Sequence, residues 1–443
     1  MKYIDASITG SRDDAPPLCV LQALILATHA LVMRGIRGRE WRYIGTCIRL
    51  VFELGLHATD LEYSPDPCQT DPEEWCLKEE RRRAYWAVWE IDQFANHMRH
   101  LSISTHWATN SVHLPSDDKL WSQCIPWRGC RLNPDPRERF QDVLDIQSGS
   151  AKAWYIVVTS LELEAYQIAY PKERTLGFSQ SGKRSYGDRW RILSETIQLT
   201  IDRLPAELAF DELMLDFGTR TYGFTQTSLH SLSLIYLINM MPELARLLVL
   251  RPYLYEDYIR KLLKASRAGN RDVVPTEPQE QTSQFYRAAD AILKIIERPR
   301  GAHYRYVNPY IAHASWLAAT VKLLQQYLED DEFLKCDARM SFSFLKTTHD
   351  QFVDYWGVSG VPTQTLDILD TRLNRFAAAM ITSGHCCLLS VHDYRFTAPG
   401  VLPTASSQLD SLECSDELGI SSRLRWPLAM QRVNELEAIL HEY

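Results

Sequence analysis

Apolar residues recur with a helical period along most of this chain. Between residues 40 and 54 they fall three or four positions apart and would share one face of a helix. That face consists of Trp41, Ile44, Ile48, Val51 and Phe52. Gly55 follows, where a residue in the left-handed conformation commonly ends a helix. The pattern therefore predicts a helix over residues 40–54.

The start of the next predicted helix is marked by its polar residues. Asp71 can cap the helix, Pro72 suits its first turn, and Glu74 lies three residues after the cap, as in a capping box. An apolar stripe then runs to about Met98 and is formed by Leu77, Ala84, Tyr85, Val88, Ile91 and Ala95. These signals predict one long helix over residues 72–98.

Helical periods continue through the rest of the chain, and strand signals are scarce. The pattern predicts further helices over residues 148–170, 190–204, 229–250, 280–297, 308–329, 342–356, 365–381 and 425–441. Residues 99–147 lack a sustained period, and residues 388–422 are rich in Ser, Thr and Asp. We therefore predict an all-α fold: a large single helical domain of many packed amphipathic helices with irregular connecting loops.

Composition and charge narrow the class of protein. Of the 443 residues 45% are hydrophobic, which is typical of a globular protein, and the net charge is −8, which is unlike a free-standing nucleic-acid binder. The ten cysteines include no C-x-x-C pair, so we expect them to be reduced inside a cell. The apolar stretches 18–33 and 231–241 are shorter than a membrane span requires, so we expect a soluble protein.

Two segments, residues 39–60 and 79–118, carry a recognisable pattern. A Leu-Gly-Leu-His step ends the first segment's helix. A Glu-Arg-Arg-Arg run, a Trp and an Asp follow in the second, which closes on Val-x-Leu-Pro. The residues are Leu54, Gly55, Leu56, His57, Glu80, Arg81, Arg82, Arg83, Trp86, Asp92, Val112, Leu114 and Pro115. This pattern resembles the fungal-specific transcription factor domain, the regulatory (middle homology) region of fungal zinc-cluster transcription factors.

The resemblance is most specific over residues 39–118 and extends more diffusely over 18–380. Later residues that resemble the family are Leu250, Arg251, Pro252, Arg287, Ala288, Ala289 and the helix after Pro309. The resemblance implies a regulatory domain over residues 18–385. A flexible N-terminus would precede it over residues 1–17, and residues 386–443 would form a polar segment and a C-terminal helix. Met98, Arg99 and His100 depart from the family's Gly-Arg-Pro step.

The resemblance also implies a function, namely transcription regulation in the nucleus without enzymatic activity. The family's DNA-reading module is a six-cysteine zinc cluster with two C-x-x-C pairs, and this sequence contains no such pair. We therefore expect no cofactor in this chain, and DNA contact only through a missing cluster or a partner's cluster. Expected partners are other transcription regulators, a second copy of the chain, and a small-molecule effector. An alternative is a co-regulator that dimerises with a complete factor.

The arginine run Arg81–Arg83 has two interpretations, a basic patch and a set of structural ion pairs. Three arginines inside an amphipathic helix beside Glu79 and Glu80 favour structural pairing, because the planar guanidinium suits carboxylates and backbone carbonyls. We expect Asp92 to be one of their partners. Loss of Arg82 should then destabilise the fold.

Other motifs indicate chemistry only weakly. GFSQSGK at residues 177–183 matches most of a phosphate-binding loop, but Arg184 replaces the required Ser or Thr and no strand precedes it. His97 and His100, with His106 and His113, lack a matched second ligand pair for zinc, and 385–387 is too crowded for a closed site. We therefore predict neither a nucleotide site nor a metal site.

An all-α enzyme of the terpene cyclase type is the remaining alternative. Such an enzyme needs an Asp-Asp-x-x-Asp motif to hold magnesium, and the acidic pairs 117–118 and 330–331 both lack the third carboxylate. Aromatic residues are dense in 41–43, 85–94 and 304–316, where packing explains most of them. An apolar effector pocket between helices is the functional hypothesis for these stretches.

Overall fold

The computed structural model describes most of the chain up to residue 382. The described residues are 2–11, 14–61, 70–99, 101, 104–105, 111–170, 180–209, 215–217, 226–267, 279–329, 331–358 and 361–382. The predicted helix 425–441, the polar segment 388–422 and residues 385–387 lie outside them.

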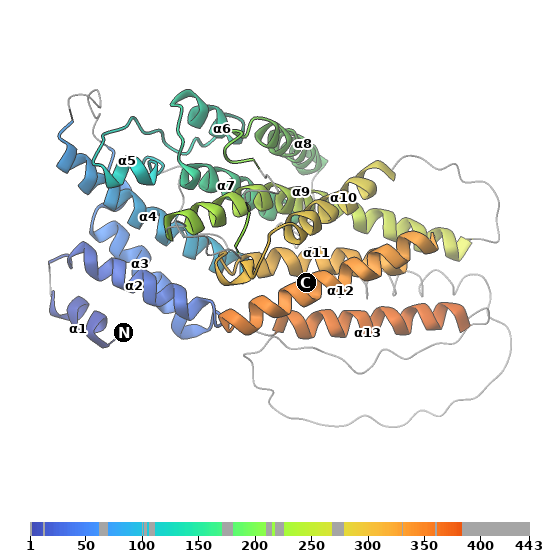
Figure 1. Cartoon of the computed structure of the whole chain (residues 1–443). Coiled ribbons are helices and arrows are strands. Elements are labelled where there is room, and N and C mark those ends of the chain that lie inside the picture. Colours follow the sequence, from blue (N-terminus) through green and yellow to red (C-terminus); the bar gives the residue numbers. More distant parts are fainter. Residues whose placement is uncertain are drawn as a thin grey trace. The chain divides into compact units, whose positions relative to one another are not determined.

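Helices account for nearly all of the described secondary structure, which confirms the predicted all-α fold (Figure 1). Among the described residues there are two isolated β-bridges and no strand. The helices are α1 (Lys2–Gly10), α2 (Leu18–Val32), α3 (Gly38–Glu53), η1 (Leu56–Ala58), α4 (Pro72–Met98), α5 (Asp118–Ser122), α6 (Pro136–Asp145), α7 (Ala151–Ala169), α8 (Gln180–Asp202), α9 (Gln226–Arg267), α10 (Gln279–Glu297), η5 (His303–Arg305), α11 (Ile311–Leu328), α12 (Glu332–Trp356) and α13 (Val361–Thr382).

The predicted start of α4 is confirmed in atomic detail. The Asp71 carboxylate accepts a hydrogen bond from the backbone N–H of Glu74 at 3.0 Å, and Pro72 occupies the first turn. The left-handed residue after α3 is also present, because Gly55 has a φ of 67°. Capping residues therefore set both ends of the segment that separates α3 from α4.

Two segments contain helices that the sequence pattern did not predict. The stretch 99–147 is not wholly irregular, because Asp117 caps α5 and Asp135 caps α6 with Pro136 behind it. These helices have 5 and 10 residues, too few to produce a clear period. Helix α1 lies within residues 1–17, which we expected to be flexible, and none of its residues is buried.

Helix α9 runs through Pro242, as the predicted helix 229–250 requires, but its apolar part is longer than the stretch 231–241. Its apolar run does not end at Pro242, so Leu229–Arg251 is long and apolar enough to cross a membrane by length and composition. However, 83% of that window is buried inside the protein. An apolar helix that other helices surround in this way is typical of a hydrophobic core.

The chain divides into two compact units. The first unit comprises residues 1–254 and 277–368, and the second comprises 255–276 and 369–443. Of the second unit the structure describes the end of α9 and the end of α13. All the sites discussed below belong to the first unit.

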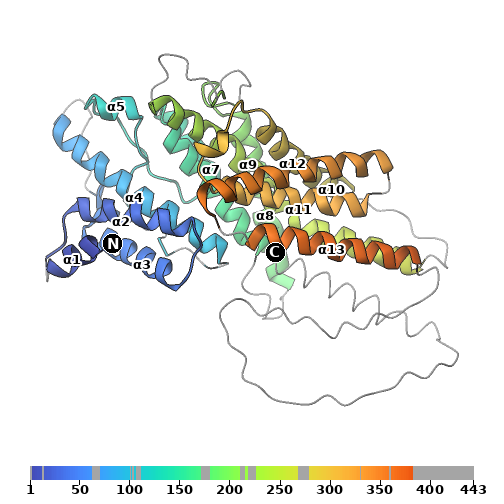
Figure 2. The ribbon, with the colours of Figure 1, turned by 60° about the horizontal axis from the view of Figure 1, so that its bottom comes forward.

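Within the first unit, two groups of helices stand out. Helices α2, α3 and α4 pack against one another at the N-terminal end, and α11 packs against α10 and α12 (Figure 2). Helix α7 contacts α4 and is buried nearly all round from Ala153 to Ala169. A helix that is apolar on all faces must be enclosed by others, so α7 is a central element of this core.

One carboxylate lies in that core. Glu162 of α7 is fully buried, and its Oε1 accepts a hydrogen bond from the Tyr310 hydroxyl at 3.3 Å. The amide of Gln93 donates to its Oε2 at 3.3 Å, and His97 Nδ1 lies 3.2 Å from Oε1. Burial raises the pKa of Glu162 to about 8, against the opposing effect of the hydrogen bonds from Tyr310 and Gln93. The group therefore holds its proton near pH 7 in the folded protein.

This pKa predicts a pH-dependent stability. Between the ordinary value of 4.5 and about 8, the folded chain keeps a proton that the unfolded chain has lost. The group's contribution is therefore complete below pH 4.5 and is lost as the pH rises through about 8, with a slope of at most about 1.4 kcal/mol per pH unit. Glu162→Gln removes this titration. Urea unfolding at several pH values should show a smaller loss of stability with rising pH in the variant, and identical slopes would contradict the assignment.

Candidate functional site

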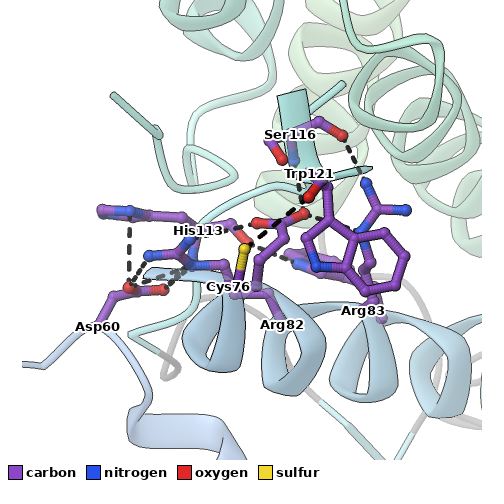
Figure 3. Close-up of polar contacts among 9 residues, drawn as sticks. Asp60, Cys76, Arg82, Arg83, His113, Ser116 and Trp121 are labelled. Carbon is purple, nitrogen blue, oxygen red and sulfur yellow. Dashed lines mark hydrogen bonds and ion pairs between the residues drawn. The ribbon is translucent and has the colours of Figure 1, made fainter. Parts of the chain in front are cut away.

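The residues that carry the sequence pattern meet around one arginine on α4. The Arg82 guanidinium binds the Asp60 carboxylate in a two-pronged arrangement, Nε to Oδ2 at 2.9 Å and Nη2 to Oδ1 at 2.6 Å (Figure 3). The two side chains are 7% and 4% exposed. Such a bidentate, desolvated pair is among the strongest polar contacts available to a protein.

A second buried carboxylate completes the group. Glu79 lies one turn before Arg82 on α4, and its side chain is fully buried. Its Oε2 accepts from Arg82 Nη1 at 3.2 Å, and its Oε1 accepts from Arg83 Nε at 3.0 Å. We call the four residues Asp60, Glu79, Arg82 and Arg83 the arginine clamp.

The arginine clamp holds an extended segment, residues 111–116, against α4. The backbone N–H of His113 donates to Asp60 Oδ2 at 2.8 Å, and that of Ser116 donates to Glu79 Oε1 at 2.8 Å. The indole N–H of Trp86 donates to the carbonyl of His113 at 2.8 Å. Both carboxylates therefore bridge an arginine side chain and a backbone amide of this segment.

Arg83 ties α5 to the same group. Its Nη1 binds Asp118 Oδ1 at 2.6 Å, and its Nη2 donates to the carbonyl of Ser116 at 2.9 Å. The guanidinium lies 4.2 Å from the ring centre of Trp121, in a cation–π contact (Figure 3). The second acidic residue of the pair 117–118 is thus a structural partner of an arginine.

The Leu-Gly-Leu-His sequence at residues 54–57 ends α3 beside α4. Arg81 Nη2 donates to the carbonyl of Leu54 at 2.6 Å, where the helix has no further N–H to offer. Leu56 is fully buried, and the carbonyl of His57 accepts from the backbone N–H of Ser111 at 2.9 Å. The step therefore turns the chain so that Asp60 meets Arg82.

Asp92 does not pair with an arginine, so that expectation is wrong. Its Oδ2 accepts from the backbone N–H groups of Ser104 and Thr105 and from the Thr105 hydroxyl, all at 2.8 Å. Asn96 donates to its Oδ1 at 2.6 Å. The side chain is fully buried and holds the chain after α4. The three arginines find their partners in other elements or one turn away on α4.

The remaining pattern residues are also structural. Glu80 accepts a hydrogen bond from the Gln22 amide of α2 at 2.7 Å. Leu114 and Pro115 are buried, and the backbone N–H of Leu114 donates to the carbonyl of Cys130 at 2.8 Å. Apart from Asp92, the singled-out residues therefore lie in the contacts among α2, α3, η1, α4, α5 and the segment 111–116.

The charges of the arginine clamp are mutually compensated. Burial by itself would raise the pKa of Asp60, but the hydrogen bonds and charge of Arg82, together with His113, outweigh it and lower that pKa. Burial lowers the pKa of His113, so its ring is neutral near pH 7. The hollow beside Glu79, Arg82 and Trp127 measures about 10 Å³, which is room for a single water. The geometry is that of a structural ionic network rather than a substrate site.

The other candidates from the sequence do not form a site. Among the described residues, no group of three or more His, Cys, Asp or Glu side chains is placed to hold a metal. His97 is buried beside Glu162, and its Nε2 lies 3.0 Å from His313 Nε2. His100, His106 and residues 385–387 lie outside the described residues. So do residues 177–179 of the loop-like motif, and α8 begins at Gln180, within that motif.

Comparison with known proteins identifies the segment that contains the arginine clamp. The family described as "Fungal specific transcription factor domain" matches residues 4–126. Residues 4–126 are therefore similar to this domain. The match covers the predicted specific part, 39–118, and begins before residue 18. The extension of the resemblance to residue 380 stays a prediction.

Two curated fungal proteins are similar to part of the chain. The tropolone cluster transcription factor tropK of Talaromyces stipitatus is 31% identical over 116 residues, which are 25% of this chain and 19% of tropK. An uncharacterized transcriptional regulatory protein of Schizosaccharomyces pombe is 29% identical over 80 residues, 18% of this chain and 12% of that protein. The chain thus spans less than a fifth of the length of either relative. No solved structure matches the chain.

The sequence indicated the arginines of this domain and the neighbouring Glu79, but not Asp60. Asp60 was named only as the end of the first segment, because a partner 22 residues away in another element leaves no periodic signal. Glu79 offered a signal in its spacing, since residues three and four positions later on a helix are its neighbours. The structure confirms that Glu79 pairs with the arginines at that spacing.

Substitution of Arg82 tests the structural role of the arginine clamp. Arg82→Met keeps the volume but leaves two buried carboxylates without their counter-charge, so we expect a loss of about 3–5 kcal/mol in the free energy of unfolding. Denaturant unfolding measures this loss. The matched control is Arg191→Met, because the Arg191–Glu195 pair is 59% exposed on both sides and should contribute about 0.5 kcal/mol or less. Equal effects of the two substitutions would contradict a buried structural role for Arg82.

Proposed function

We propose that this chain is a fungal transcription regulator that acts in the nucleus. The observation that carries the proposal is the family match over residues 4–126, which contains the whole arginine clamp. Both curated relatives are transcription regulators by name. The chain spans less than a fifth of the length of either relative, so the activity of the whole protein is part of the proposal.

The domain would act through contacts and not through chemistry of its own. In the arginine clamp every charged group is paired with another side chain or a backbone group, and the adjacent hollow holds no more than about 10 Å³. A catalytic group needs a free acid, base or nucleophile beside room for a substrate. The proposed role of these residues is to keep α3, α4 and the segment 111–116 in one fixed arrangement, and a partner protein would bind to that arrangement.

DNA would be reached through a zinc cluster that is not among these 443 residues. The sequence contains no C-x-x-C pair, and its net charge of −8 does not favour binding of a polyanion. The cluster would belong to a longer form of the protein or to a dimer partner. Proposed partners are another transcription regulator or a second copy of this chain, together with a small-molecule effector.

A transcription reporter tests this function. The chain is fused to a heterologous DNA-binding domain and expressed in yeast with a reporter gene downstream of that domain's site. We expect the fusion to change reporter output reproducibly, in either direction, relative to the DNA-binding domain alone. The Arg191→Met fusion should behave like the wild type, and the Arg82→Met fusion should lose the effect. A nuclear, well-expressed fusion that leaves output unchanged would contradict the proposal.

A further inference from the structure

A cavity of about 260 Å³ lies in the N-terminal half of the first unit, apart from the arginine clamp. It lies between α2, α4, α7 and the turn that precedes α11. Its lining consists of Ile25, Leu26, His29, Val32, Met33, Ala87, Glu90, Ile91, Gln93, Phe94, Tyr155, Thr159, Asn308 and Tyr310. Two of the aromatic stretches in the sequence, 85–94 and 304–316, thus contribute to its wall.

The size and lining of the cavity set the kind of molecule that fits. Half of the lining residues are apolar, and they come from α2 and α4. An apolar cavity of about 150 Å³ holds one benzene ring, so a cavity of this volume has room for about two fused rings. Leu26 lies at the rim, since it is 74% exposed while it still lines the cavity.

One side of the wall is polar and firmly positioned. The Gln93 amide nitrogen donates to the carbonyl of Thr159 at 3.2 Å and to Glu162 at 3.3 Å. Within the described part of the chain, no hydrogen bond is made to the carbonyl oxygen of Gln93, although the residue is only 3% exposed. Tyr310 is fixed by its own hydrogen bond to Glu162. The wall therefore offers a positioned acceptor that a hydrogen-bond donor of a ligand can meet.

The charges around the cavity disfavour an anion. The lining contains no Lys or Arg. Burial lowers the pKa of His29, so its ring is neutral near pH 7. The one carboxylate of the lining, Glu90, is paired with Lys152. An acidic ligand would lose its hydration here without meeting a free cation.

We propose that this cavity is a binding site for an uncharged, largely apolar molecule of about two fused rings that donates a hydrogen bond to Gln93. A regulatory role for this site rests on the proposed function. The binding of the ligand does not rest on it, because binding follows from the cavity alone. A bound ligand would bridge α2 to α4 and α7, and would thereby stabilise their arrangement.

Binding of 2-naphthol to the purified full chain tests the site, with 2-naphthoate as the charged counterpart. We expect saturable binding of one 2-naphthol per chain by calorimetry, and at least about tenfold weaker binding of 2-naphthoate. Ala87→Phe fills the cavity from α4 and should weaken 2-naphthol binding at least about tenfold. Ala206→Phe, which adds the same ring at an exposed position outside the lining, should bind like the wild type.

Circular dichroism separates a blocked cavity from a misfolded variant. If Ala87→Phe does not fold, Leu26→Asp takes its place, because an exposed rim residue can be changed without disturbing the core, and it should weaken binding several-fold. A wild type that shows no saturable 2-naphthol binding, equal affinity for both probes, or unchanged affinity in the folded cavity variant would overturn the proposal. Binding that persists while the transcription reporter stays silent would refute the proposed function and leave the site in place.

Discussion

The buried pair of Arg82 and Asp60 is the interaction on which the N-terminal arrangement depends. A charge removed from water is costly unless a counter-charge and enough hydrogen bonds accompany it. Arg82 meets this condition only when Asp60, which follows η1, and Glu79, one turn earlier on α4, both lie beside its guanidinium. Both carboxylates also accept backbone N–H groups of the segment 111–116. One ionic contact therefore fixes elements that are far apart in the sequence.

The fold could be predicted from the sequence to the extent that it is local. The period and the caps located α3 and α4, since Gly55 and Asp71 satisfy their helix ends through neighbouring residues. The short helices α5 and α6 were missed because a helix of 5 or 10 residues with few apolar positions leaves no sustained pattern. Their capping residues, Asp117 and Asp135, were the remaining signal.

The sequence was enough to predict that the arginines of the candidate site have a structural role, but not which residues they contact. Three arginines beside two glutamates indicated structural pairing, and the structure places all three arginines in such contacts. The choice of Asp92 as a partner was wrong because Asp92 follows the arginines by 9 to 11 positions on α4, about 13–17 Å along the helix, whereas Glu79 lies within about one turn of Arg82 and Arg83. Asp92 is occupied by backbone amides of the following segment. Long-range pairing is decided by how helices pack, which no local period encodes.

Amide hydrogen exchange tests most directly whether the arginine clamp holds the segment 111–116. The protection of the His113 and Ser116 amides is compared between wild type and Arg82→Met, with the interior amides of α7 as an internal reference. We predict that these two amides lose protection by about tenfold or more beyond any change in α7. Protection at His113 and Ser116 that changes no more than in α7 would contradict it.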